Sequence, residues 1–205
     1  PKPVLRDLSR LARQAERSRS LDSLLGTEGA AAAAYFGNFT QMLRREDDYT
    51  FHFSGRNRRP PLDPVNALLS FCYALLTRTV TVAATSVGFD AQRGFYHQPR
   101  YGRPALALDL MEPFRPLLCE STVLTLINNG EVRPSDFIRA AGAVTLTDDG
   151  RKRVIAAFER RLDQEVQHPL FGYRASYRRI VELQTRLLGR FLLGEIPSNP
   201  NFITR

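Results

Sequence analysis

The stretch Asp63–Leu76, which reads DPVNALLSFCYALL, decides how this chain folds. Asp63 is a residue type that caps helix N-termini, and Pro64 suits the first helical turn, where its missing N–H costs nothing. The residues that follow are apolar almost all the way round a helix, which is typical of a helix enclosed by other elements. We therefore predict a central, buried helix of roughly six turns from Pro64 to about Ser86.

Further helices are expected on both sides of this central one. Apolar residues recur at helical spacing over residues 4–25, 20–43, 104–118 (continuing to about 129), 148–166 and 173–194. Residues 44–59 read as a flexible, basic loop with a candidate extended piece at 49–53, and 88–103 as a second loop. Residues 145–147 are expected to form a short strand or turn. The predicted fold class is all-α, with one multi-helix domain over residues 1–205.

The charge of the chain favours a polyanionic partner. There are 29 Lys and Arg residues against 21 Asp and Glu, which gives +8, and the pI is about 10.1. Nucleic acid or an anionic surface would suit that balance, although a surplus of surface arginine would give the same numbers. The sequence has no uninterrupted apolar run long enough to cross a bilayer and no signal peptide, so no membrane partner is expected. Cys72 and Cys119 lie in apolar stretches and read as reduced core residues of a cytoplasmic protein.

Glu28 interrupts the apolar face of its predicted helix. At 100° per residue it lies in a stripe formed by Leu21, Leu24, Ala31, Ala32, Tyr35 and Phe39. An ionised carboxylate on a buried stripe is costly unless it is paired or ligated. Pairing with one of the many arginines and binding of a metal ion both explain Glu28.

Two more acids, Asp109 and Glu112, lie on the apolar helix that begins after Pro104. They are three residues apart and share a face, where two like charges repel each other and lose hydration. A divalent cation would remove both problems, because hard cations prefer carboxylate oxygens. Salt bridges to nearby arginines such as Arg115 are the alternative explanation.

His97 lies in the loop before these acids, within Gly94-Phe95-Tyr96-His97, and its position makes it a candidate metal ligand. His52 and His168 are weaker candidates. Arginines that could contact a phosphate backbone lie before the central helix and around His97: Arg56, Arg58, Arg59, Arg100 and Arg103. One Glu, one His, two helical acids and flanking arginines together suggest metal-assisted phosphoryl-transfer chemistry.

The central helix carries a polar seam of Asn66, Ser70, Tyr73 and Thr77 at positions i, i+4, i+7 and i+11. The seam is expected to be either a buried hydrogen-bonded layer or the lining of a site.

The sequence resembles the CRISPR-associated integrase Cas1 family. The resemblance is carried by residues 24–29 (LLGTEG), 55–70 (GRNRRPPLDPVNALLS), 94–97 (GFYH) and 108–116 (LDLMEPFRP), and it extends over essentially the whole chain. The combined order of these motifs is specific, whereas each alone would be weak.

The resemblance implies a set of site residues. The catalytic residues would be Glu28, His97, Asp109 and Glu112, and the metal ligands would be Glu28, His97 and Glu112. Asp109 matches a nearby acid that supports the metal or the DNA strand, and Asn66 and Tyr73 match polar positions that line the site. Arg100 stands where relatives often carry a basic residue, which suggests a phosphate contact. The oxygen-rich ligand set suits Mg²⁺ or Mn²⁺.

The activity implied by the resemblance is spacer integration, in which a DNA 3′-hydroxyl attacks a phosphodiester of the CRISPR repeat. The expected partners are double-stranded DNA, a second copy of the chain, the protein Cas2, and a fused or separate Cas4 nuclease. In the family a small β-domain precedes the helical one. Residues 1–3 would then be a remnant of the linker, and a chain without that domain is expected to bind metal and DNA weakly and to integrate poorly.

Two other classes of function were weighed against an integrase. A helical metallophosphohydrolase would use a His-Asp dipeptide and several His ligands, whereas this chain has three His and no His-Asp pair. A non-catalytic nucleic-acid binding or assembly domain would explain the charge but would leave Glu28, Asp109 and Glu112 without a purpose on apolar faces.

Overall fold

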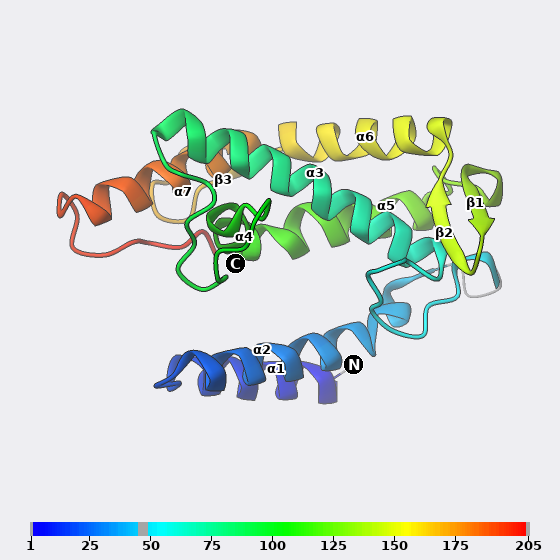
Figure 1. Cartoon of the computed structure of the whole chain (residues 1–205), viewed down its shortest axis with the longest axis horizontal. Helices are drawn as coiled ribbons and strands as arrows, with labels where there is room; N and C mark the ends of the chain where they lie inside the picture. Colours follow the sequence, from blue (N-terminus) through cyan, green and yellow to red (C-terminus); the bar gives the residue numbers. More distant parts are fainter. Residues whose placement is uncertain (1, 45–48, 204–205) are drawn as a thin grey trace.

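The computed structural model describes residues 2–44 and 49–203 (Figure 1). Its α-helices are α1 (Lys2–Glu16), α2 (Leu21–Phe36), α3 (Pro64–Val87), α4 (Ala105–Met111), α5 (Ser121–Asn128), α6 (Asp148–Asp163) and α7 (Tyr177–Leu192). Short 3₁₀ turns are η1 (Phe39–Met42), η2 (Tyr49–Phe51), η3 (Glu112–Phe114) and η5 (Pro134–Asp136), and η4 (Arg115–Glu120) is a π-helix. The predicted all-α class is confirmed.

Helix α3 is the central element, as its sequence predicts. Asp63 caps its N-terminus by accepting a hydrogen bond from the Asn66 backbone N–H, and Gly88 ends it in the left-handed conformation with φ of +98°. It packs against α4, α5, α6 and α7, and Leu68, Leu69 and Leu76 are completely buried. Each such leucine contributes roughly 1.5–3 kcal/mol to folding.

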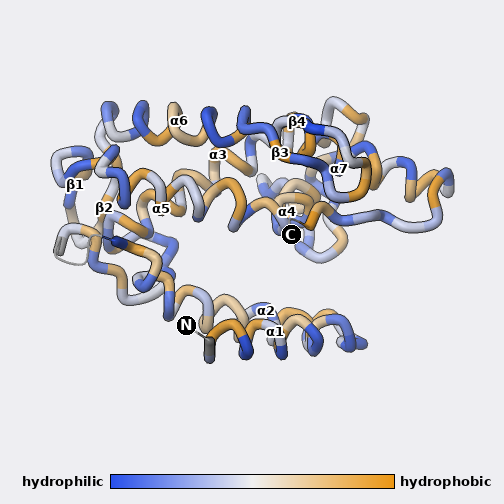
Figure 2. The backbone as a smooth tube through the Cα atoms, turned by 180° about the vertical axis from the view of Figure 1, so that it is seen from behind, coloured by the Kyte–Doolittle hydropathy of each residue, from blue (hydrophilic) through white to orange (hydrophobic). Residues whose placement is uncertain are grey.

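By length and composition, α3 would also suffice to cross a membrane. It lies instead among α4, α5, α6 and α7 (Figures 1 and 2), and 44% of its most apolar window is buried inside the protein. Along α6 and at the tip of the α1–α2 pair, by contrast, hydrophilic segments are frequent in Figure 2.

Helices α1 and α2 form a hairpin that lies to one side of the main body (Figure 1). The two helices pack chiefly on each other, and Thr27 is the one residue of α2, a helix described throughout, that is fully buried. Residues 17–20 form the turn between them, and Ser20 caps α2. The predicted helices over residues 4–25 and 20–43 therefore both end earlier than expected.

The long helix predicted over 104–118 and on to 129 is broken. It consists of α4, η3, η4 and α5, and the break begins at Glu112. Pro113 and Pro116 lie inside the broken part, and neither has an N–H to continue an α-helical hydrogen-bond ladder. The change of pitch places Glu112 at the C-terminal end of α4, beside the loop that carries His97.

Two small antiparallel hairpins were not fully predicted. Strands β1 (Phe137–Ala140) and β2 (Ala143–Leu146) pair with Phe137 opposite Leu146, so the short strand expected at 145–147 is present but begins earlier. Strands β3 (Glu165–Gln167) and β4 (Arg174–Ser176) occupy the ends of the helices predicted over 148–166 and 173–194. Within the candidate extended piece 49–53, residues Tyr49–Phe51 are helical rather than extended. Of the predicted loop 44–59, residues 45–48 lie outside the described part.

Candidate functional site

Asp109 organises the loop that carries His97. Its Oδ2 accepts hydrogen bonds from the backbone N–H groups of Phe95 (2.6 Å) and Tyr96 (3.0 Å). Its Oδ1 accepts from the backbone N–H of His97 (2.8 Å) and lies 2.7 Å from Nδ1 of the same residue. Both carboxylate oxygens are therefore engaged, so Asp109 holds the loop and the imidazole in place.

The glycine of this segment is required by the close approach of the loop to α4. A Cβ on Gly94 would meet the His97 carbonyl oxygen at 2.7 Å, the Ala105 carbonyl carbon at 2.8 Å and Asp109 Oδ2 at 2.8 Å. Any side chain there would push the loop off Asp109. The Gly94–His97 motif is thus a packing requirement for the position of His97.

The hydrogen bond to Asp109 sets the tautomer of His97. With Nδ1 carrying the proton that Asp109 accepts, Nε2 presents a lone pair. Nε2 lies 3.9 Å from Glu112 Oε1, which is too long for a hydrogen bond. His97 therefore offers a nitrogen ligand on the side of Glu112.

Glu112 is half-buried and has an unusual environment. Burial raises the pKa of Glu112 to about 7, because the lowering effects of Arg115 and Arg58 are outweighed by burial together with the neighbouring Glu28 and Asp109 carboxylates. Arg115 Nη2 lies 2.7 Å from Oε1 of Glu112, but its N–H is not aligned with that oxygen, which makes no hydrogen bond. Glu112 is thus a buried carboxylate whose negative charge is only partly compensated.

Glu28 approaches this group from the α1–α2 hairpin. Its Oε2 accepts a hydrogen bond from the Tyr96 hydroxyl, in the residue next to His97. Partial burial and this bond raise the pKa of Tyr96, so its hydroxyl remains a donor. Glu28 has no arginine at ion-pair distance in the described part of the chain, and pairing with arginine therefore does not explain it.

The expectation that Glu28 lies on a buried stripe is wrong. Glu28 is half-exposed, and Leu21 of the same stripe is 48% exposed. The reason is that α2 packs mainly on α1, so that the face bearing Glu28 is only partly covered by the body of the protein.

Two of the three predicted ligands, His97 and Glu112, are close enough to share a divalent metal ion. Oε1 of Glu112 makes an ion pair with Arg115 but no hydrogen bond, and its 3.9 Å separation from Nε2 of His97 is within the sum of two metal–ligand bonds of about 2.1 Å each. Among the described residues no three His, Cys, Asp or Glu side chains are gathered closely enough to hold a metal. Two of the predicted ligands thus face each other, and Glu28 is linked to them through Tyr96.

An arginine-rich cavity of about 800 Å³ opens beside His97. All five arginines predicted to contact DNA line it, together with Arg115. Arg58, Arg59, Arg100 and Arg103 form no ion pair with any described carboxylate. We call this region the arginine cavity. Its guanidinium groups would attract a polyanion toward His97.

The polar seam of α3 borders the arginine cavity at one end. Arg56 donates to Asn66 Oδ1 (2.7 Å) and Ser70 Oγ (3.1 Å), and its guanidinium lies over the Tyr73 ring at 5.3 Å. Tyr73 lines the cavity, whereas Asn66 is completely buried and holds Arg56 and the Gly55–Asn57 backbone. Around Asn66 the seam is therefore a buried hydrogen-bonded layer, whereas at Ser70 and Tyr73 it lines the arginine cavity.

Sequence reasoning missed three side chains of this region. Tyr96 contacts Glu28. Arg115 contacts Glu112, and its guanidinium lies 5.4 Å from the centre of the Tyr73 ring. Tyr101 is fully exposed at the tip of the turn that Arg100 and Arg103 close. Arg115 was considered only as a salt-bridge partner, a role that the structure bears out. An aromatic residue between two arginines in a loop is a signal that could have identified Tyr101.

The other two histidines lie outside the site. His52 is exposed in the loop before α3. His168 is buried among Phe171, Tyr173 and Phe202, and its Nδ1 accepts from the Leu170 and Phe171 backbone. Cys72 and Cys119 are buried free thiols, as predicted.

Comparison with known proteins places this geometry in context. A family model described as CRISPR associated protein Cas1 matches residues 2–160. A protein of Geobacter sulfurreducens named CRISPR-associated exonuclease Cas4/endonuclease Cas1 fusion is 61% identical over 207 residues, which cover 100% of this chain and 37% of that protein. The chain thus spans little more than a third of the length of this relative.

Solved structures show the same fold. One described as a casposase bound to integration product superposes with a TM-score of 0.82 at 28% identity, over 96% of this chain and 58% of the other. A second, described as a Cas6-RT-Cas1–Cas2 complex, superposes with a TM-score of 0.84 at 28% identity, over 98% of this chain and 22% of the other. The helical arrangement found here therefore recurs in both solved structures.

Proposed function

Since this chain belongs to the Cas1 family of CRISPR-associated proteins, we propose that it is the part of a metal-dependent DNA integrase that carries the metal ligands. The reaction proposed is attack of the 3′-hydroxyl of spacer DNA on a phosphodiester of the CRISPR repeat. The attacking oxygen bonds to phosphorus and loses its proton, the bond from phosphorus to the repeat's own 3′-oxygen breaks, and that oxygen leaves as a 3′-hydroxyl, so the spacer is joined to the repeat. The observation that carries the proposal is the pair formed by His97 and Glu112, held by Asp109 beside the arginine cavity.

The metal ligands would be Glu28, His97 and Glu112. When bound, Mg²⁺ or Mn²⁺ would lower the pKa of the attacking hydroxyl and stabilise the charge that develops on the phosphate oxygens. Asp109 contributes by keeping the Nε2 lone pair of His97 directed toward Glu112, which is the role of carboxylates behind metal-bound imidazoles in other proteins.

The arginine cavity would hold the DNA against this centre. Arg58, Arg59, Arg100 and Arg103 supply guanidinium groups for phosphate oxygens. Tyr101 offers an exposed aromatic face on which an unpaired base can stack. No side chain is needed as a covalent nucleophile, because the DNA hydroxyl itself attacks the phosphorus.

The proposed partners follow from the relatives. The Geobacter relative combines a Cas4 exonuclease with a Cas1 endonuclease, and one solved assembly contains Cas1 and Cas2. We expect the protein that contains this chain to bind double-stranded DNA, to pair with a second copy of itself, and to act with Cas2 and Cas4.

Substituting Glu112→Ala in the full-length protein tests the proposal. Strand transfer with Mg²⁺ or Mn²⁺ should be lost while the affinity for DNA is kept, because the arginine cavity is unchanged. Glu131→Ala is the matched control, since Glu131 pairs with Arg160 away from the site. If the Glu112 variant integrates as well as the parent, the chain is a binding or assembly domain.

A second experiment locates the metal. Crystals of the full-length protein soaked in Mn²⁺ should show an anomalous peak between Glu28, His97 and Glu112. A peak elsewhere, or none under conditions in which the protein integrates DNA, would contradict the ligand assignment.

A further inference from the structure

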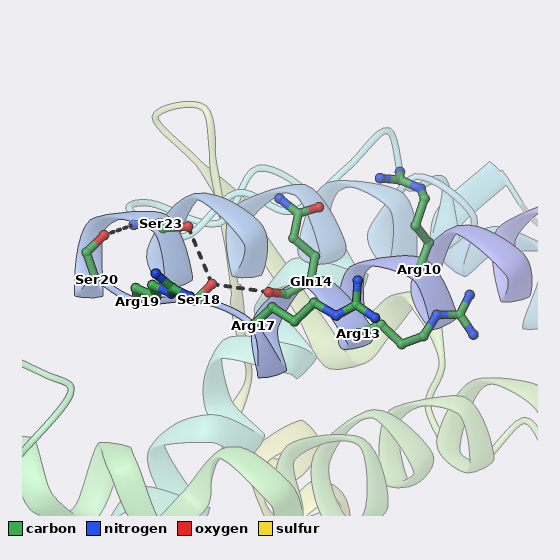
Figure 3. Close-up of a pocket in the computed structure, with 8 residues that line it drawn as sticks. All are labelled: Arg10, Arg13, Gln14, Arg17, Ser18, Arg19, Ser20 and Ser23. Atoms are coloured by element: carbon green, nitrogen blue, oxygen red, sulfur yellow. Dashed lines mark hydrogen bonds between the residues drawn. The ribbon is translucent and has the colours of Figure 1, made fainter.

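The tip of the α1–α2 hairpin carries a second concave, basic surface. It encloses about 530 Å³ and is lined by Arg10, Arg13, Arg17 and Arg19 together with Ser20 and Ser23 (Figure 3). No acidic side chain lines it. We call it the hairpin arginine surface, and it is formed by different elements from those that line the arginine cavity.

The positive charge of this surface is largely uncompensated. Arg13, Arg17 and Arg19 form no ion pair with any described residue, and Arg10 has one contact, with Asp7 at 3.7 Å between two exposed side chains. Exposed pairs of this kind are worth little. By contrast, Arg179, Arg186 and Arg190 of α7 are each paired with Glu182 or Glu195.

The arginines of α1 are regularly spaced. Arg6, Arg10 and Arg13 stand at i, i+4 and i+7, and so lie within about 60° of one another around the helix, and Arg17 follows in the turn directly after α1. Neighbours along this stripe are separated by roughly 4.5–6 Å of helix axis, and Arg6 and Arg13 by about 10 Å. A row of like charges at such a repeat suits the evenly spaced phosphates of a nucleic acid.

Hydroxyl groups at the turn add neutral hydrogen-bonding capacity. Ser18 Oγ donates to the Gln14 carbonyl oxygen (3.3 Å) and lies 3.4 Å from Ser23 Oγ, while Ser20 Oγ caps the Ser23 N–H (3.2 Å) (Figure 3). Serine hydroxyls and arginines are among the side chains that contact phosphate oxygens and so position a protein on DNA.

The hairpin arginine surface is connected to the proposed active site by α2 itself. Glu28 follows Ser20 by eight residues, which corresponds to about 12 Å along the helix. Successive phosphates of one strand advance by about 3.4 Å along a duplex, so this distance amounts to three or four nucleotides.

We propose that the hairpin arginine surface binds the phosphate backbone of duplex DNA about three or four nucleotides away from the phosphodiester that reacts near Glu28. The inference rests on the proposed function. It adds a second anchoring point, on a different element from the arginine cavity, which fixes the direction in which the duplex leaves the site. A regular repeat of guanidinium groups favours a phosphate backbone over an acidic protein, whose carboxylates have no fixed repeat.

The test is the salt dependence of DNA binding by the full-length protein, measured with a linear duplex and with divalent metal chelated. The variant Arg10→Gln/Arg13→Gln/Arg17→Gln keeps good helix formers in α1 while removing three charges. The control Arg179→Gln/Arg186→Gln/Arg190→Gln removes the same net charge from ion-paired positions. A third variant, Arg10→Lys/Arg13→Lys/Arg17→Lys, keeps the charge.

The slope of log affinity against log salt should become shallower by about 2 to 3 in the glutamine variant, since each lost phosphate contact removes about 0.9. Affinity at moderate salt should fall about tenfold or more. The control variant and the lysine variant should keep the parental slope.

Equal slopes for the parent and the glutamine variant would overturn the inference, and so would an equal loss in the α7 control. Loss of a protein partner with unchanged DNA binding would also overturn it. The proposed function has a different failing result. If the parent binds no DNA, or if Glu112→Ala leaves strand transfer intact, the proposed function is wrong, whatever the hairpin variants show.

Discussion

Asp109 and Glu112 are both acids on one helix face, yet the structure gives them different tasks. Asp109 accepts three backbone hydrogen bonds and faces the ring nitrogen Nδ1 of His97, so it has no free oxygen for a metal. Glu112 has a buried oxygen that makes an ion pair with Arg115 but no hydrogen bond, and burial raises the pKa of Glu112 to about 7. We therefore expect Asp109 to be a positioning residue and Glu112 to be the proposed metal ligand.

Substituting Asp109→Ala tests this division of roles. The affinity of the full-length protein for Mn²⁺ should fall about 10- to 100-fold, because His97 loses the partner that orients it. Isothermal titration calorimetry measures this affinity directly. Asp90→Ala is the control, since Asp90 lies in the same loop but contacts only exposed neighbours there, the Arg93 side chain and the Gln92 backbone N–H. An unchanged affinity in the Asp109 variant would show that the loop holds its conformation without the carboxylate.

Glu120 is a second buried acid, on the far side of Tyr73. It accepts a hydrogen bond from the Tyr73 hydroxyl on one oxygen, while its other oxygen has no partner. Burial raises the pKa of Glu120 above its usual 4.5, against the lowering effects of Tyr73, Arg115 and Arg56. The folded protein thus holds a proton that the unfolded chain releases, and stability declines as the pH rises from about 4.5 through the raised pKa.

Glu120→Gln should consequently stabilise the fold most at alkaline pH. The gain in melting temperature should shrink as the pH falls through the raised pKa of Glu120 and should disappear below about 4.5, where the carboxyl is neutral in both states. Calorimetric melting at several pH values measures it. Glu195→Gln at the exposed end of α7 serves as the comparison. A gain that does not depend on pH would mean that packing, not charge, is responsible.

At the scale of elements, α3 supports both the core and the arginine cavity. Asp63 caps the helix through Asn66 N (2.8 Å) and also accepts from the Asn57 and Asn66 side-chain amides (3.3 and 2.6 Å). The same asparagine, Asn66, holds Arg56 in the cavity. The start of the helix and the shape of the cavity are therefore coupled through a few hydrogen bonds.

Removing the cap with Asp63→Ala should lower the free energy of unfolding by about 1–3 kcal/mol. The affinity for DNA should fall as well, because Asn66 and Arg56 lose their support. Denaturant unfolding followed by circular dichroism measures the first effect. Ser20→Ala, which removes the cap of α2, should leave the main transition unchanged, since the hairpin packs mainly on itself. If both variants unfold alike, the hairpin and the body form one cooperative unit.

The whole molecule consists of a tightly packed body around α3 and a hairpin at its side (Figure 1). Glu28 belongs to the hairpin, whereas His97 and Glu112 belong to the body. The hydrogen bond from the Tyr96 hydroxyl to Glu28 joins Glu28 to the loop that carries His97. The proposed three-ligand metal site therefore requires the hairpin to be held at a fixed position against the body.

Hydrogen exchange followed by mass spectrometry tests this coupling. Amides of α2 should exchange faster than those of α3, because few buried contacts hold the hairpin to the body. Mn²⁺ should slow exchange in α2, and Glu28→Gln should remove that protection without changing α3. Equal protection of the two helices, or no response to Mn²⁺, would contradict a metal site shared between them.

The central helix and the candidate residues of the site can both be read from the sequence. The cap Asp63, the apolar residues after it and the periodic faces of the other helices are local patterns, and local patterns suffice to predict α-helices. Glu28, His97, Asp109 and Glu112 stood out because charged side chains interrupt apolar faces or lie beside them. The five predicted arginines proved to line one cavity.

Tertiary structure alone decided how those residues are arranged. The roles of Asp109 and Glu112 depend on where three consecutive backbone amides of a loop point, and no periodicity encodes the path of a loop. The exposure of Glu28 depends on which partner covers α2, and the break at Glu112 depends on two prolines acting within a packed core. Tyr96 joined the site because long-range packing brings its loop to Glu28 of α2. Arg115 meets Glu112 through i,i+3 spacing, which the sequence does contain, but it meets Tyr73 of α3 only through the packing of the fold.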